Sequence, residues 1–309
     1  MFGISRFPTQ PLPRYDQSAQ RAAAQIIAAY STSFSFASEL LAPRTRTDIR
    51  NLYAVVRIAD EIVDGAATAA GLNTTEVEQT LNAYEEAVLR APSQRFHTDP
   101  VLHAYGISAR RCGFRDEHIR AFFASMRRDL HQCDYVDEED LEAYIYGSAE
   151  VIGLLCLSAF LVDHPVSDPE LSQLETGARR LGAAFQKVNF LRDLGADTAQ
   201  LGRSYFPQAG HGGLSAQDKD LLIADIRSDL ATARAVTGRL PFSARVGVTA
   251  ATDLFEALTN DLAALPADAV FSQRTRVSTP RKLSLLTRAT LHSLRKLSLI
   301  HISEPTRPY

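Results

Sequence analysis

The sequence lacks the features of several common protein classes. Among its 309 residues, no run approaches the ~20 apolar residues that a membrane-spanning helix needs, so we expect no transmembrane segment. Lysine and arginine are spread along the chain rather than gathered into a basic arm, and the formal net charge is −3. A nucleic-acid partner is therefore not expected.

Cysteine is scarce. Cys112, Cys133 and Cys156 are far apart and form no Cys-x-x-Cys pair, which argues against a disulfide framework and a structural zinc site. The pattern is typical of thiols in a reducing cytoplasm. Residues 1–15 lack the apolar core of a signal peptide. We therefore expect a cytoplasmic protein.

The chain ends in an unusual segment. Residues 297–309 read LSLIHISEPTRPY and resemble the translation of an adapter used in sequencing libraries. We interpret them as a non-native tail and leave them out of the fold prediction. The rest shows no linker and no repeat of fixed period, which predicts an N-terminal extension at 1–16 and one domain at 17–296.

Apolar residues recur at helical spacing almost throughout. No sustained period-two alternation flanked by turn signals is found, so the pattern predicts an all-α fold. The expected helices cover residues 17–30, 47–64, 73–90, 116–130, 137–162, 170–194, 215–233, 248–265 and 279–296. Asn73 with Glu76, and Ser215 with Asp218, are typical helix-capping pairs.

Two of these helices carry a polar stripe on an otherwise apolar segment. The first stripe has spacings of four, three and four and consists of Tyr53, Arg57, Asp60 and Asp64. The second has spacings of three, four and four and consists of Gln186, Asn189, Asp193 and Asp197. These intervals place each stripe on one helical face, which predicts that both point into a cavity.

Each stripe holds an Asp-x-x-x-Asp pair. Two carboxylates at this spacing repel each other by about 0.2–0.5 kcal/mol even when exposed, and Mg²⁺ (or Mn²⁺) could offset that cost. Mg²⁺ binds carboxylates together with water and phosphate oxygens. Arg57 and Arg192 can bind phosphate, and Asn189 offers a neutral oxygen. A single Asp-x-x-x-Asp motif usually lies on a solvent-exposed helix face. Two such stripes on apolar helices instead indicate a functional site.

Five segments make the sequence similar to the squalene/phytoene synthase family. They are YSTSFSFAS at 30–38, RNLYAVVRIADEIVDG at 50–65, YIYGSAEVIGLL at 144–155, AAFQKVNFLRDL at 183–194 and GRSYFP at 202–207. Their amino-acid sequences most resemble those of bacterial phytoene synthases. The resemblance implies a single-domain isoprenoid synthase, an all-α helical bundle around a central cavity.

The resemblance also implies roles for individual residues. Metal binding is implied for Asp60, Asp64, Asn189, Asp193 and Asp197. Substrate binding is implied for Ser31, Ser33, Phe34, Tyr53, Arg57, Gln186, Asn189, Arg192, Arg203 and Tyr205. Catalytic roles are implied for the four aspartates and for Tyr144, which could instead be a core aromatic.

Gly153 and Ala196 lie within or next to the segments that carry the resemblance. Gly153 would either leave room for the isoprenoid or let two helices pack closely. Ala196 stands where the family commonly has Glu, so metal binding is expected with altered electrostatics.

The implied reaction is that of a phytoene synthase. Two geranylgeranyl diphosphates would condense head to head through a cyclopropylcarbinyl (prephytoene) diphosphate, giving phytoene and diphosphate without NADPH. Alternatives are a squalene or dehydrosqualene synthase using farnesyl diphosphate, a terpene cyclase, and a non-catalytic binding or assembly factor.

Two expectations concern association. We expect a monomer or weak dimer. We also hypothesise that the basic stretch at 274–283 and the helix expected at 279–296 allow peripheral docking on the inner face of an anionic membrane.

Overall fold

A computed structural model describes residues 8–131, 135, 137–201 and 214–272. All regular elements within these ranges are helical, which confirms the predicted all-α class. The helices are α1 Pro11–Tyr30, α2 Thr32–Glu39, α3 Pro43–Asp64, α4 Ala66–Ala69, α5 Thr74–Arg90, α6 Pro100–Cys112, α7 Asp116–Asp129, α8 Glu138–Ile145, α9 Val151–Leu161, α10 Asp168–Leu201, α11 Ala216–Thr237, α12 Phe242–Ala264 and α13 Ala267–Ser272. A 3₁₀ turn spans Ala91–Ser93, and a π-helical turn, Tyr146–Glu150, joins α8 to α9.

Local sequence explains many helix ends. The side chain of Asn73 accepts from the backbone N–H of Glu76, and Glu76 reaches back to Asn73, so the predicted capping box at α5 is confirmed. Ser215 caps α11 as predicted. α3 ends at Asp64, before Gly65, also as predicted.

Three features differ from the sequence prediction. α1 begins at Pro11 rather than Gln17, because proline is well suited to the first helical turn. Within its first turns the Tyr15 hydroxyl donates to the carbonyl of His97 at 2.9 Å, and Asp16 pairs with buried His103 at 2.8 Å. Residues 11–16 are therefore part of the bundle. The helix predicted at 137–162 is interrupted by the π turn, and α2, α4, α6 and α13 were not predicted.

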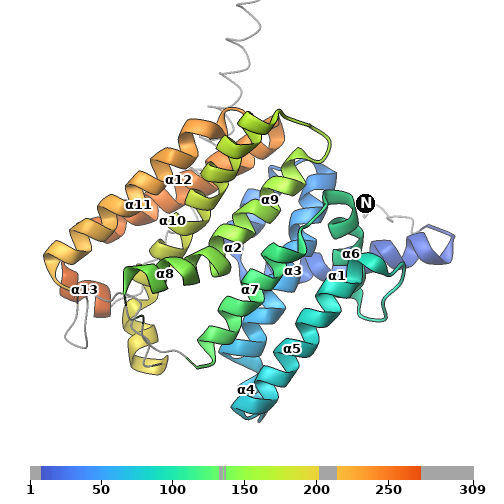
Figure 1. Cartoon of the computed structure of the whole chain (residues 1–309), viewed down its shortest axis with the longest axis horizontal. Helices are drawn as coiled ribbons and strands as arrows, with labels where there is room; N and C mark the ends of the chain where they lie inside the picture. Colours follow the sequence, from blue (N-terminus) through green and yellow to red (C-terminus); the bar gives the residue numbers. More distant parts are fainter. Residues whose placement is uncertain (1–7, 132–134, 136, 202–213, 273–309) are drawn as a thin grey trace, which may run out of the picture.

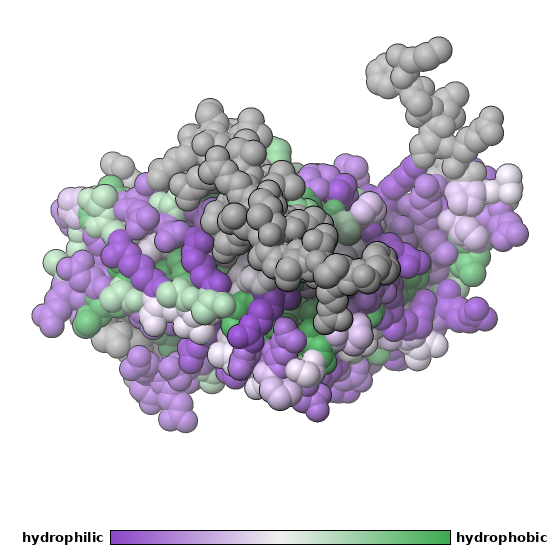
Figure 2. All heavy atoms as spheres, turned by 90° about the horizontal axis from the view of Figure 1, so that it is seen from above, coloured by the Kyte–Doolittle hydropathy of each residue, from purple (hydrophilic) through white to green (hydrophobic). Residues whose placement is uncertain are grey.

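The helices form two groups (Figure 1). α1, α3, α5, α6 and α7 share one apolar core with α9, while α8, α10, α11 and α12 share a second. α9 packs against both α7 and α10 and so joins the groups. Seen from above, the described surface is mostly hydrophilic with apolar residues scattered over it (Figure 2). The segments predicted at 202–207 and 274–296 lie outside the described residues.

One described helical stretch, Glu138–Leu161, is long and apolar enough to cross a membrane by composition alone. However, 61% of its apolar window is buried inside the protein, as in a core helix of a folded domain. This stretch contains the motif YIYGSAEVIGLL, and several of its residues line the cavity described below.

Gly153 marks a close approach of α9 to α10. A Cβ atom at this position would overlap the carbonyl oxygen of Ala178 and lie 3.0 Å from its carbonyl carbon. Both atoms belong to backbone, which cannot move away as a flexible side chain could. Helix packing therefore requires glycine here, although Gly153 also lies on the wall of the cavity described below.

We expect Gly153→Ala to lower the free energy of unfolding by about 1–3 kcal/mol, because it overpacks the α9–α10 contact. Urea denaturation followed by circular dichroism measures this. Gly238→Ala is the matched control, since nothing lies within 4 Å of its Cβ position and its φ of −60° suits alanine. A Gly153→Ala variant as stable as the control would contradict the packing role.

Candidate active site

A cavity of about 1150 Å³ lies between the two groups of helices. It is larger than the usual small-molecule pocket of ~300–1,000 Å³. Most of the side chains singled out from the sequence line it, namely Ser31, Phe34, Tyr53, Arg57, Asp60, Asp64, Tyr144, Gln186, Asn189, Arg192 and Asp193. Residues separated by more than 160 positions in the chain thus meet at one site.

Four of the predicted site residues cannot be placed at the cavity. Arg203 and Tyr205 lie outside the described residues. Ser33 and Asp197 belong to α2 and α10, but their side chains lie outside what the structure describes. Their roles remain predictions.

On α3, Arg57 of the polar stripe contacts two acidic side chains. Its guanidinium donates to Glu61 and lies 3.7 Å from the carboxylate of Asp60. It also lies over the ring of Tyr30, at 4.3 Å from the centroid. These contacts fix a cation at the cavity wall, one helical turn from the first aspartate.

Asp60 carries a strongly shifted pKa. Burial raises its pKa to about 7, and the carboxylates of Asp64, Asp129 and Glu61 act in the same direction, although Arg57 opposes them. Several carboxylates thus lie close to Asp60 in a partly apolar region, where their negative charges disfavour its ionisation. A cation bound among them would relieve that repulsion.

On α10, an arginine also lies beside an aspartate of the polar stripe. The guanidinium of Arg192 makes a two-pronged contact with the carboxylate of Asp193, with Nε at 3.0 Å from Oδ1. Gln186 and Asn189 lie on the same cavity wall. Each wall therefore offers an acid with an arginine beside it.

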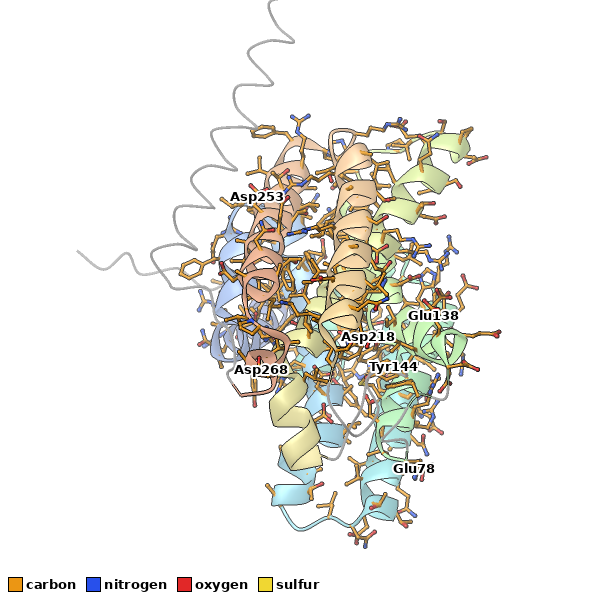
Figure 3. The ribbon with its side chains drawn as sticks, turned by 90° about the vertical axis from the view of Figure 1, so that its left-hand side faces the viewer. Glu78, Glu138, Tyr144, Asp218, Asp253 and Asp268 are labelled. Atoms are coloured by element: carbon orange, nitrogen blue, oxygen red, sulfur yellow. The ribbon has the colours of Figure 1, made fainter. Side chains whose placement is uncertain are left out.

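Asp129, the last residue of α7, is a cavity residue that the sequence pattern did not predict. The hydroxyl of Tyr144 donates to its Oδ2 at 2.9 Å, and both residues line the cavity. A signal was present in the sequence, since the cavity-lining residues Phe122, Met126 and Asp129 have the four-and-three spacing of the other stripes. In Figure 3, Tyr144 lies toward the interior of the bundle, while Glu138 of the same helix lies at its edge.

Aromatic rings form an apolar wall next to the polar residues. Phe185 and Phe255 stack with centroids 3.7 Å apart, and Phe34 lies 6.1 Å from each. Phe34 also lies 6.4 Å from Tyr53. Side chains of this kind exclude water and present π faces to a cation.

The donors suit Mg²⁺ better than a softer metal, because they are carboxylate and amide oxygens. Within the ranges that the structure describes, no three acidic, histidine or cysteine side chains converge tightly enough to hold an ion by themselves. That arrangement still fits Mg²⁺, which keeps several waters and takes one or two carboxylates together with substrate phosphates. Asp60, Asp64, Asn189 and Asp193 would be its protein ligands.

Known proteins share this sequence pattern. A family model described as squalene/phytoene synthase matches residues 27–281. Phytoene synthase 3, chloroplastic, of Zea mays is 27% identical over 99% of this chain and 73% of its own length. The 15-cis-phytoene synthase of Paracoccus sp. is 31% identical over 57% of this chain, and the 4,4'-diapophytoene synthase of Staphylococcus haemolyticus is 29% identical over 60%. These matches span 56% and 61% of the two bacterial proteins.

The fold also has solved counterparts. A dehydrosqualene synthase in complex with ligand superimposes with a TM-score of 0.68 at 21% identity, covering 91% of this chain and 99% of that one. The family model covers most of the chain, including both acidic stripes, and the fold agrees. The chain belongs to the squalene/phytoene synthase family, whose members are prenyltransferase-like enzymes.

Proposed function

We propose that this protein is a phytoene synthase, which condenses two molecules of geranylgeranyl diphosphate head to head with the aid of Mg²⁺. The observation that carries the proposal is the pairing of acids with arginines on α3 and α10, along one large cavity with aromatic walls. Anionic heads and long apolar tails are the two parts of such a substrate, and the cavity offers a surface for each.

The polar residues would bind the diphosphate groups. Arg57 and Arg192 now contact Asp60 and Asp193, and their guanidinium groups can bind phosphate oxygens in the same fork geometry. Mg²⁺, when bound to the aspartates and the diphosphate, would neutralise the charge of the leaving group. The arginines, and the Mg²⁺ that the aspartates would hold, would thus place positive charge beside the diphosphate as the carbon–oxygen bond breaks.

The remaining residues would protect and direct the allylic cation. The rings of Phe34, Phe185 and Phe255 keep water away from it and offer π faces. The hydroxyl of Tyr144, hydrogen-bonded to Asp129, would provide a proton-accepting pair at the cavity. A proton must leave the final cation to give a neutral hydrocarbon, and this pair is suited to receive it.

One observation supports a long substrate over a shorter one. The cavity, at about 1150 Å³, exceeds the ~300–1,000 Å³ of usual small-molecule pockets. The alternative is a squalene or dehydrosqualene synthase that uses farnesyl diphosphate. The likeness to a diapophytoene synthase keeps that alternative in view.

Product analysis tests the substrate. Purified protein with Mg²⁺ and geranylgeranyl diphosphate should form phytoene without NADPH, detected by chromatography and mass spectrometry. Farnesyl diphosphate should react at least about tenfold more slowly, on the scale expected for loss of several buried methylene contacts. A C30 hydrocarbon as the preferred product would instead support the farnesyl-diphosphate alternative. No hydrocarbon from either substrate, even after a native C-terminus replaces residues 297–309, would support the non-catalytic role.

Asp60→Asn and Asp193→Asn should each lower kcat by about a hundredfold or more, because each removes a carboxylate from the diphosphate end of the cavity. Steady-state kinetics at saturating Mg²⁺ measures the loss. Asp220→Asn is the control, since Asp220 is exposed on α11 and away from the cavity. Retention of full activity in either site variant would refute the assignment of that carboxylate.

Stability should depend on the charge of Asp60. Its pKa in the folded protein, about 7, lies above its ordinary value of 3.8, so folding favours the protonated form. This contribution is complete below pH 3.8 and is lost as the pH rises through 7. Without metal, Asp60→Asn should therefore raise the free energy of unfolding at pH 8 by on the order of 1 kcal/mol and change it little at pH 4.

Urea denaturation in the presence of EDTA measures this difference. Addition of Mg²⁺ with inorganic diphosphate should stabilise the natural chain at pH 8 more than the Asp60→Asn variant, because the variant lacks one ionised ligand. A variant that is less stable than the natural chain at pH 8 without metal would contradict the electrostatic account.

A further inference from the structure

Arg128 lies at the corner where the end of α7 meets the start of α8. Its Nη2 donates to Oδ1 of Asp140 at 2.6 Å and to the carbonyl oxygen of the same residue at 3.3 Å. Its guanidinium carbon lies 5.8 Å from the ring centroid of Tyr144 and 5.7 Å from that of Tyr135. The guanidinium is thus held at one end by a carboxylate and lies against two aromatic rings.

Two residues of α7 contact two residues of α8, and we call this set of contacts the clamp. Arg128 and Asp129 are consecutive residues in the last turn of α7, and Asp140 and Tyr144 are four apart, on one face of α8. Arg128 binds Asp140 and lies over the ring of Tyr144, while Asp129 accepts the hydrogen bond of that ring's hydroxyl at 2.9 Å. Neighbouring residues of one helix therefore fix both the ring and its hydroxyl.

Tyr144 is packed on its other sides as well. It is 4% exposed, and its ring lies 5.1 Å from that of Tyr135 and 6.0 Å from that of Phe190. Its backbone carbonyl accepts from the hydroxyl of Ser125 at 3.3 Å. In the described part of the chain, Tyr144 and Asp129 line the cavity whereas Arg128 and Asp140 do not. Among these contacts, the one that connects Arg128 to the cavity is its contact with the ring of Tyr144.

We propose that Arg128 is a positioning residue that holds the ring of Tyr144 so that its hydroxyl stays bonded to Asp129 at the cavity wall. The guanidinium contributes a cation–π contact to the ring and a charge-assisted hydrogen bond to Asp140. Without it, the aromatic ring has one fewer restraint and the Tyr144–Asp129 pair loses its fixed geometry. This inference rests on the proposed function only in assigning chemistry to that pair.

The kinetic test uses Arg128→Met, which keeps the length and apolar volume of the side chain but removes its charge and donors. We expect kcat to fall about tenfold with KM changed less than about twofold, the scale of one lost contact that acts only on the chemical step. Arg128→Lys, which keeps the charge without the planar fork, should recover part of the loss.

Arg127→Met is the matched control. Arg127 is the preceding residue and pairs with the nearly buried carboxylate of Glu85 at 2.5 Å and with Asn82 at 3.1 Å, away from Tyr144. This variant loses an ion pair of similar kind, so its stability should fall while kcat stays within about twofold. Equal losses of kcat in the two variants would refute a role specific to Tyr144.

A double-mutant cycle with Tyr144→Phe shows whether Arg128 acts through the hydroxyl. In the Tyr144→Phe background, Arg128→Met should lower kcat by less than about twofold further, because the group it positions is gone. Losses that multiply in the double variant would overturn the proposal.

A measurement without turnover separates this inference from the proposed function. With 3-fluorotyrosine in place of the ten tyrosines, the ¹⁹F resonance of Tyr144 is identified by its disappearance in Tyr144→Phe. It should shift or broaden in Arg128→Met and remain in place in Arg127→Met. An unchanged resonance in Arg128→Met would refute the clamp, even if the natural chain proves inactive with every prenyl diphosphate tested.

Discussion

The central constraint on this structure is that several carboxylates lie close together beside a partly apolar cavity. Burial raises the pKa of Asp60, and the nearby carboxylates of Asp64 and Asp129 raise it further. Arginines beside Asp60 and Asp193 offset part of it, and a diphosphate with divalent cations would offset the rest. The negative charges that repel one another at this site would also attract the divalent cations of the proposed mechanism.

Close helix packing brings these groups to one cavity. Glycines 153 and 182 let the backbones of α9, the π turn and α10 touch, because a Cβ at either position would meet backbone atoms of the facing helix. Buried Glu150 adds an ion pair to Arg179 at 2.6 Å across the same interface. The π turn lies between Tyr144 and this tight contact, and such turns are often found at functional sites. The packing thus fixes the wall that carries Tyr144 relative to the wall that carries Asp193.

Much of this could be predicted from local sequence. Helical periodicity, the capping box at Asn73 and the stop at Gly65 depend on residues within a few positions of one another, and the structure agrees with them. The two polar stripes were predicted for the same reason. Asp129 was missed because its cavity-facing neighbours, Phe122 and Met126, read as an ordinary apolar face. α2 was missed because its eight residues carry only a weak apolar pattern, and its position depends on contacts with α12 and α3.

The sequence by itself determined the all-α class, the two polar stripes and the resemblance to the family, because spacing along a helix decides which side chains share a face. Tertiary structure decided which faces meet. It placed Asp129 against Tyr144, assigned Gly153 to a backbone contact with α10, and set Arg128 over an aromatic ring contributed by the next helix. Each of these depends on the distance between separate helices, which periodicity does not encode, since it is set by the side chains that both helices bury between them.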